Sequence, residues 1–319
     1  MKVPYKEAKK RTGRPPITVR WVDTNKGDEV TENYRSRLVA RQLKAHDHSN
    51  TSYFAPAPPL EALRTILSLA VTEIGSHKPI LDPKFPKRSQ LSFVDVKRAY
   101  FNAPIDPRDP PTYVRLPSED EDHQTTCAKL VRHMYGTRMA ADGWQQEYST
   151  LLIVKLGFRQ GGGHANLFYH PERGIRTSVH GDDFTSQGPC DQLDWFEASI
   201  AEHYEITLGP RLGPGDNDAK ESRAFNRIVR WCSDHIEYEA DPRQAERLIT
   251  ELGLEGSHPM VTPGVRVAGP ELTADSELMA RAATAFRGSA ARGNYFGPDR
   301  VDGMLSSRAR KSAASWQNQ

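Results

Sequence analysis

The 319-residue sequence is poor in cysteine, in long apolar runs and in net charge. Its three cysteines, Cys127, Cys190 and Cys232, have no Cys-x-x-Cys spacing, so neither a zinc site nor a disulfide framework is indicated. The longest apolar runs, such as residues 151–154, are far too short to span a membrane, and we expect no signal peptide. These absences favour a soluble chain, or a soluble piece of a larger one, in a reducing intracellular environment.

The near balance of charge, 43 Lys and Arg against 41 Asp and Glu, gives a net charge of +2 and says little about partners. The distribution is more informative. Residues 1–14 form a basic N-terminal arm that contains a single acid, whereas residues 119–122 are a solid acidic block. A basic arm suits binding to a phosphate backbone, and a solvated terminus is the equally good alternative.

Hydrophobic periodicity and turn residues divide the chain into short strands and helices. The expected strands are residues 17–24, 34–43, 91–96, 113–116, 167–169, 176–180, 224–231 and 235–239. The expected helices are residues 60–74, 141–155, 191–204 and 242–253. Residues 76–88 resemble an exposed loop, and the glycine- and proline-rich residues 209–218 are the best candidate for a subdomain boundary.

Two short segments place aspartates at the ends of strand-like apolar runs, at residues 93–101 and 179–184. Alone, Asp95 would be interpreted as an edge or turn residue, and Gly-Asp-Asp is common in turns. Together, Asp95, Asp182 and Asp183 supply three carboxylates from two strands, which a site for two divalent metals needs. This combination favours a nucleic acid polymerase.

Tyr100 follows Asp95 closely, and the small Ala99 beside it would let neighbouring backbone approach. An aromatic ring at this place could pack under the sugar of an incoming nucleotide and exclude a 2′-hydroxyl. The alternative is that Tyr100 and Phe101 are ordinary core aromatic residues.

Several segments, in order over roughly residues 17–290, resemble the reverse transcriptases of copia-type LTR retrotransposon Pol polyproteins. Residues 95–102 (Asp-Val-Lys-Arg-Ala-Tyr-Phe-Asn) resemble the first catalytic motif, and residues 179–184 resemble the Tyr-Val-Asp-Asp hairpin. Residues 134–138 with Trp144 resemble the Tyr-Gly-Leu-Lys-Gln-Ala-Pro-x-x-Trp motif. Residues 21–22 with 34–41 resemble the fingers segment of the family, residues 54–56 with 63–67 and 262–263 also resemble the family, and residues 286–289 do so more faintly.

The resemblance implies that Asp95 and Asp182 chelate two Mg²⁺ ions, with Mn²⁺ as an alternative, and that Asp183 completes the carboxylate set. In such a site, one ion activates the primer 3′-hydroxyl as the nucleophile, and the other neutralises the negative charge of the triphosphate and the leaving pyrophosphate.

Further binding roles follow from the same resemblance. Arg35 and Arg37 would bind the triphosphate through bidentate hydrogen bonds. The alternative is that they only form a solvent-exposed face of a strand. Tyr100 would select the sugar, Gly136 would let backbone approach the nucleotide or template, and Arg138 would contact phosphate.

The implied fold is α+β, a right-hand polymerase with fingers, an antiparallel-sheet palm and a small thumb-like region. Its expected divisions, after the basic arm, are fingers at 15–90, a palm with the catalytic motifs at 91–210, a thumb-like region at 211–265 and a partly disordered C-terminal extension at 266–319.

The expected function is RNA-directed DNA synthesis on an RNA or DNA template with a primer and dNTPs. The chain would be a fragment of a polyprotein, acting in a cytoplasmic particle or the nucleus, without membrane contact. His180-Gly181 replaces Tyr-Val of the family pattern, and Thr137, Met139 and Ala141 also depart from it. These departures favour one alternative, a degenerate or co-opted copy that binds nucleic acid without polymerising. A metal-dependent phosphohydrolase is a weaker alternative, because the His-rich ligand spacing of that class is missing.

Overall fold

The chain divides into two compact units, Met1–Asp218 and Ala219–Gln319. The computed structural model describes residues 1–27, 30–42, 55, 57–72, 89–258 and 279–300. The glycine- and proline-rich loop expected at a boundary ends where the first unit ends.

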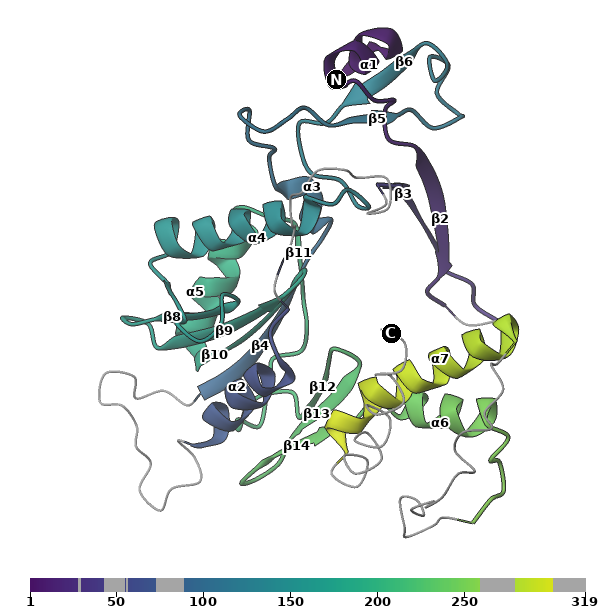
Figure 1. Ribbon diagram of the computed structural model, residues 1–319. Helices are drawn as coiled ribbons and strands as arrows, with labels where there is room; N and C mark the ends of the chain where they lie inside the picture. Colours follow the sequence, from purple (N-terminus) through teal and green to yellow (C-terminus); the bar gives the residue numbers. More distant parts are fainter. Residues whose placement is uncertain (28–29, 43–54, 56, 73–88, 259–278, 301–319) are drawn as a thin grey trace. The chain divides into compact units, whose positions relative to one another are not determined.

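An antiparallel six-stranded sheet forms the centre of the first unit (Figure 1), in the order β11-β4-β10-β9-β8-β7. Its strands are β4 (Ser89–Val96), β7 (Arg159–Gln160), β8 (Leu167–His170), β9 (Ile175–His180), β10 (Asp183–Pro189) and β11 (Ile206–Leu208). In β4 and β10, only Asp95 and Asp183 are not buried. A strand buried on both faces belongs in the middle of a covered sheet, and the two carboxylates stand at the end of that buried surface.

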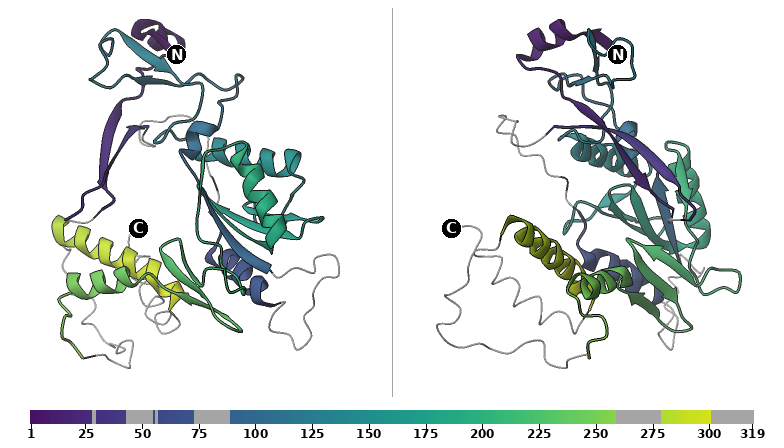
Figure 2. Two further views of the ribbon diagram at one scale, coloured as in Figure 1. Left: turned by 180° about the vertical axis from the view of Figure 1, so that it is seen from behind. Right: turned by 90° about the vertical axis from the view of Figure 1, so that its right-hand side faces the viewer.

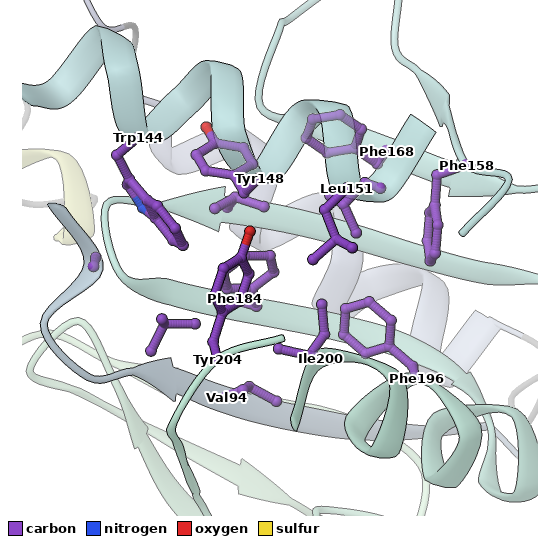
Figure 3. Close-up of a cluster of buried hydrophobic side chains, with 14 of the residues drawn as sticks. Val94, Trp144, Tyr148, Leu151, Phe158, Phe168, Phe184, Phe196, Ile200 and Tyr204 are labelled. Atoms are coloured by element: carbon purple, nitrogen blue, oxygen red, sulfur yellow. The ribbon is translucent and has the colours of Figure 1, made fainter. Parts of the chain in front are cut away.

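Helices pack against this sheet and build the main hydrophobic core. They are α2 (Leu60–Thr72), α3 (Ala99–Asn102), α4 (Ala140–Thr150) with its π-helical continuation η2 (Leu151–Lys155), and α5 (Cys190–Ala201). The core joins Val94 and Phe184 of the sheet to Trp144 and Tyr148 of α4 and Phe196 of α5 (Figure 3). The helix α2 contacts β4, β9 and β10 but contributes no residue to this cluster.

Aromatic rings dominate the core. Tyr148 lies 5.8 Å from Phe184 and 5.5 Å from Trp144 between ring centroids, in edge-to-face arrangements. Such pairs stabilise a core beyond the area that they bury. The ends of β4 and β10 that carry the aspartates therefore lie next to this packed aromatic core.

A long hairpin of β2 (Val19–Asn25) and β3 (Tyr34–Ala40) extends from the first unit (Figures 1 and 2). The expected hairpin is confirmed, with β3 ending at Ala40 rather than at residue 43. Its base is fixed because the Ala40 N–H donates to the Tyr135 carbonyl at 2.8 Å.

The basic N-terminal segment is folded, unlike the arm expected from its composition. It forms β1 (Lys2–Pro4) and α1 (Tyr5–Thr12), and β1 joins the sheet β1-β6-β5 with β5 (Tyr113–Arg115) and β6 (Thr126–Lys129). The ammonium group of Lys2 pairs with Asp120 at 2.7 Å and Asp122 at 3.0 Å. Part of the basic charge thus meets the acidic block of the same chain.

The second unit contains a three-stranded sheet and two described helices. The strands are β12 (Glu221–Ala224), β13 (Arg227–Trp231) and β14 (Ile236–Glu239), and the helices are α6 (Pro242–Glu251) and α7 (Ala280–Phe296), followed by the 3-10 turn η4 (Gly297–Asp299). Asp241 caps α6, accepting from the Arg243 N–H at 3.2 Å. A buried ion pair joins Arg227 to Asp299 at 2.7 Å.

The α+β fold with an antiparallel palm-like sheet is confirmed. The helix α7 lies within the extension expected to be partly disordered, and its Ala- and Gly-rich sequence explains why no periodic apolar pattern predicted it. The expected loop at 76–88, the end of the helix at 60–74 and most of the C-terminal extension expected at 266–319 lie outside the described residues. No described helix is long and apolar enough to cross a membrane.

Candidate functional site

The three aspartates lie at the end of the sheet where β4 and β9 end and β10 begins. Asp183 pairs directly with Asp95 in the β10–β4 ladder, and it pairs with His180 across the β9–β10 hairpin. The Val96 N–H donates to the Asp182 carbonyl at 2.9 Å, which ties the hairpin turn to β4. Two segments that are far apart in sequence therefore bring their carboxyl-bearing residues to one end of the sheet.

The turn that carries Asp182 has a defined conformation. Gly181 has φ of +64°, and no residue other than Arg98, Phe225 and Asn226 combines a side chain with positive φ in the described chain. A two-residue hairpin loop with positive φ only at its first position is a type II′ turn, which favours glycine there. The replacement of the family's valine by Gly181 thus matches the backbone of this chain.

Electrostatic repulsion is concentrated at Asp183. Burial raises the pKa of its carboxyl group to about 7, and the neighbouring charges of Asp182 and Asp95 add to that rise. Burial and Asp182 also raise the pKa of Asp95, whereas Arg35, Lys97 and Arg37 act in the opposite direction. The site therefore combines like charges in a partly desolvated place, where a cation would be bound favourably.

The arginines of the fingers-like hairpin face this charge. Arg35 and Arg37 lie opposite Thr24 and Val22, so they share one face of the hairpin. Both lower the pKa of Asp95, and the Arg37 guanidinium carbon lies 5.6 Å from the centroid of the Tyr135 ring. The hairpin thus supplies positive charge to the same site.

Aromatic rings form a second side of the site. Tyr100 lies 4.6 Å from Tyr135 between ring centroids, and Phe101 lies 5.6 Å from Tyr135. Burial, followed by the charge of Asp182, raises the pKa of both tyrosines. Tyr100 is therefore partly buried beside the aspartates, and Tyr135, which the sequence interpretation did not select, belongs to the same group.

Gly136 and Arg138 pack against the base of the hairpin. Gly136 has φ of +83°, and a β-carbon there would come within 1.9 Å of the Ala40 carbonyl oxygen. The Arg138 backbone N–H donates to Gln42 Oε1 at 2.9 Å. The close approach expected at Gly136 is thus made to β3 of the chain itself, and contact of either residue with a nucleotide stays a prediction.

Trp144 is a site residue that the sequence interpretation left without a role. Its indole Nε1–H donates to the Gly181 carbonyl at 2.7 Å, and its ring is 1% exposed in the core. The bond runs from α4 to the residue directly before Asp182. The motif that contains Trp144 was visible in the sequence, but its partner, 37 positions away, was not.

The donor set fits a hard divalent cation such as Mg²⁺, which prefers oxygen ligands and a small number of carboxylates. The carboxylate oxygens of Asp95, Asp182 and Asp183 do not all lie within 4.8 Å of one another. Among the described residues, the group that meets this distance is Cys232, His235 and Glu237. The aspartates therefore have the chemistry for metal and share one end of the sheet, but their carboxylates are not closely grouped.

Comparison with known proteins assigns the first unit to a family. The model of the family described as "Reverse transcriptase (RNA-dependent DNA polymerase)" matches residues 4–210, about two thirds of the chain. No curated protein matches the sequence.

Solved structures show only a distant likeness. Telomerase from Candida albicans, in a complex with a fragment of telomeric RNA, is 11% identical with a TM-score of 0.37, covering 80% of this chain and 53% of that one. Apo telomerase from Candida tropicalis is 9% identical with a TM-score of 0.35, covering 69% and 48%. The chain spans about half the length of these structures, and likeness at this level carries no argument about function.

Replacing Trp144 with Phe should loosen the turn at Gly181, because the Gly181 carbonyl loses its donor, a loss of about 0.5–1.5 kcal/mol. Hydrogen–deuterium exchange of a peptide covering residues 179–184 should become faster. Trp231→Phe, an equal change at a buried tryptophan of the second unit, is the matched control and should leave that peptide unchanged. Unaltered exchange in Trp144→Phe would contradict the positioning role.

Replacing Asp183 with Asn should stabilise the metal-free chain at pH 8. The folded-state pKa of Asp183 lies above its ordinary value of 3.8, so its contribution to stability falls as pH rises from about 4 to 7. The variant should melt roughly 2–4 °C higher at pH 8, the shift that about 1 kcal/mol gives in a unit of this size, and the gain should be smaller at pH 5. Asp216→Asn, in an exposed loop, should show no such gain, and a lower melting temperature for Asp183→Asn at pH 8 would refute the repulsion.

Proposed function

The chain belongs to the reverse transcriptase (RNA-dependent DNA polymerase) family, and on this premise we propose that it synthesises DNA by two-metal nucleotidyl transfer at Asp95, Asp182 and Asp183. The observation that carries the proposal is the antiparallel pairing of Asp183 with Asp95, next to the type II′ turn that presents Asp182. We further propose a copia-type element as its source and a Pol polyprotein as its context, on the sequence motifs alone.

In this proposal Asp95 and Asp182 hold two Mg²⁺ ions, or Mn²⁺, and Asp183 completes the carboxylate set. Bound ions would activate the primer 3′-hydroxyl and neutralise the triphosphate and departing pyrophosphate. The raised pKa of Asp183 supports a role at the inner end of the set, where burial makes the negative charge most costly. The chain contributes the fixed register of β4 and β10, which places Asp95 and Asp183 directly opposite each other.

Arg35 and Arg37 bind the triphosphate in this proposal. Their guanidinium groups lie near enough to act on Asp95, and they stand on one face of a hairpin fixed at its base. A planar guanidinium suits paired phosphate oxygens, which a lysine cannot contact in the same bidentate way. Arg138 and the backbone at Gly136 would contact the nucleotide or template from the base of the hairpin.

Tyr100 selects the sugar in this proposal. Its ring is held against Tyr135 and lies within the electrostatic reach of Asp182, so it borders the place where a nucleotide would sit beside the carboxylates. A ring fixed by a neighbouring ring cannot easily move aside for a 2′-hydroxyl. The substrates would be dNTPs, with a primer on an RNA or DNA template.

The proposed division of labour follows the fold. Fingers at 15–90 would include the β2–β3 hairpin, the palm at 91–210 would include the six-stranded sheet, and the thumb-like region at 211–265 would include β12–β14 and α6. The support is the position of the arginines and aspartates on the first two of these regions.

Asp182→Asn should reduce primer extension on an RNA template with Mg²⁺ and dNTPs by at least about 100-fold, a loss typical of removing one group that stabilises transition-state charge. Asp216→Asn is the charge-matched control and should extend primers like the unaltered chain. Equal extension by Asp182→Asn and the unaltered chain would refute the metal assignment.

The alternative function, nucleic acid binding by a degenerate or co-opted copy, rests on the altered His180-Gly181 and middle motif. The same experiment separates it from the polymerase. Intact binding of primer–template without extension by the unaltered chain would favour this alternative over polymerisation.

Tyr100→Ala should admit ribonucleotides. Removal of the ring should raise the ratio of ribonucleotide to deoxynucleotide incorporation by at least about tenfold, or roughly 1.4 kcal/mol of lost discrimination. Phe101→Ala is the matched control, because Phe101 packs on the same Tyr135 ring but is 39% exposed. An unchanged ratio in Tyr100→Ala, or an equal change in Phe101→Ala, would overturn the role of Tyr100.

A further inference from the structure

A second group of metal-binding side chains lies at the β13–β14 turn, entirely within the second unit. Cys232 follows β13, His235 precedes β14, and Glu237 lies in β14. One donor atom from each of the three lies within 4.8 Å of those of the other two. The Cys232 thiol is half-buried, whereas His235 and Glu237 are exposed. None of these residues has a part in the proposed polymerase site.

The hairpin itself places the three side chains on one face. Arg230 pairs with Glu237 and Trp231 with Ile236, and the Cys232 N–H donates to the His235 carbonyl at 2.9 Å. Because side chains alternate along a strand, Cys232, His235 and Glu237 lie opposite the face of Trp231, which is buried. The grouping is therefore a consequence of the ladder rather than of long side chains that happen to meet.

The imidazole of His235 is oriented as a metal ligand would be. Its Nδ1 lies 2.7 Å from Asp234 Oδ1, and its Nε2 lies 3.8 Å from Glu237 Oε1. The second distance is too long for a hydrogen bond, but it is close to the roughly 3.4 Å that separates a nitrogen and an oxygen bound to one tetrahedral zinc. A carboxylate on the far nitrogen is the usual partner of a metal-binding histidine.

Glu237 also retains an oxygen for such a ligand. Its other oxygen, Oε2, lies 3.7 Å from the Arg230 guanidinium, which makes closer pairs with Glu221 at 2.7 Å and Glu239 at 2.8 Å. Arg230 is therefore largely neutralised by its neighbours, and its contact with Glu237 is the longest of the three.

We propose that Cys232, His235 and Glu237 bind one zinc ion, with Asp234 holding the His235 ring in position. A thiolate, an imidazole and a carboxylate form a donor set suited to Zn²⁺ and to Co²⁺ rather than to Mg²⁺. Binding releases the Cys232 thiol proton, and a water molecule fills the fourth tetrahedral position. The ion would join the two ends of the turn. The ligands have the spacing Cys-x-x-His, followed by a glutamate two residues later, which differs from the paired-cysteine pattern of many zinc sites.

Titration of the full chain with Co²⁺ tests this site directly. A thiolate bound to Co²⁺ gives a charge-transfer absorption in the near ultraviolet, which a site of carboxylates alone, such as the aspartates, cannot give. The unaltered chain should show this absorption at one equivalent, and added Zn²⁺ should abolish it by displacement. Absence of the band, or its persistence after one equivalent of Zn²⁺, would overturn the proposal.

Variants identify the ligands. Cys232→Ser should lose the band, and Cys190→Ser, a matched loss of a half-buried thiol, should keep it. His235→Gln and Glu237→Gln should each weaken Zn²⁺ binding, measured by competition with a chromogenic chelator, at least tenfold. Asp234→Asn should weaken it 10- to 100-fold, the effect expected of a group that orients a ligand. A band retained in Cys232→Ser, or unchanged affinity in both His235→Gln and Glu237→Gln, would refute the site.

Discussion

The antiparallel pairing of β10 with β4 is the constraint on which the site depends. The ladder runs from Asp183 opposite Asp95 to Pro189 opposite Ser89, and Phe184 and Val94 bury their side chains in the core beneath it. A slip of one residue would turn these apolar side chains away from the core and separate the carboxylates. Hydrophobic burial thus fixes the register of β4 and β10. The same register places Asp95 and Asp183 opposite each other at the end of the strands.

That register places negative charges together at a cost in stability, which other parts of the first unit offset. Arg35 and Arg37 counter the charge of Asp95, and Trp144 anchors the turn through the Gly181 carbonyl. Burial of apolar side chains in the aromatic core stabilises the fold and offsets the free energy that the site costs. Carboxylates that repel one another lower the stability of the fold and favour binding of a cation. A metal-dependent reaction requires such a site.

Local patterns in the sequence predicted many of the elements and singled out the three aspartates, but they predicted neither β1 and α1 nor α7. The helices near residues 141–155 and 191–204 and the turn at Gly181 follow from periodicity and turn chemistry. The contact of Gly136 with Ala40 and the bond from Trp144 to Gly181 could not be predicted, because they join elements that are distant in sequence. The cluster of Cys232, His235 and Glu237 is local in sequence, but its Cys-x-x-His spacing differs from the Cys-x-x-Cys pattern on which the zinc prediction depended.

The central claim is that the β4–β10 register creates one metal site from Asp95, Asp182 and Asp183. Its most direct test is a crystal structure of the chain soaked in Mn²⁺, with anomalous scattering used to locate the metal. The account predicts anomalous density in contact with carboxylate oxygens of both Asp95 and Asp182. Ordered carboxylates with no such density, at a Mn²⁺ concentration that supports primer extension, would contradict it.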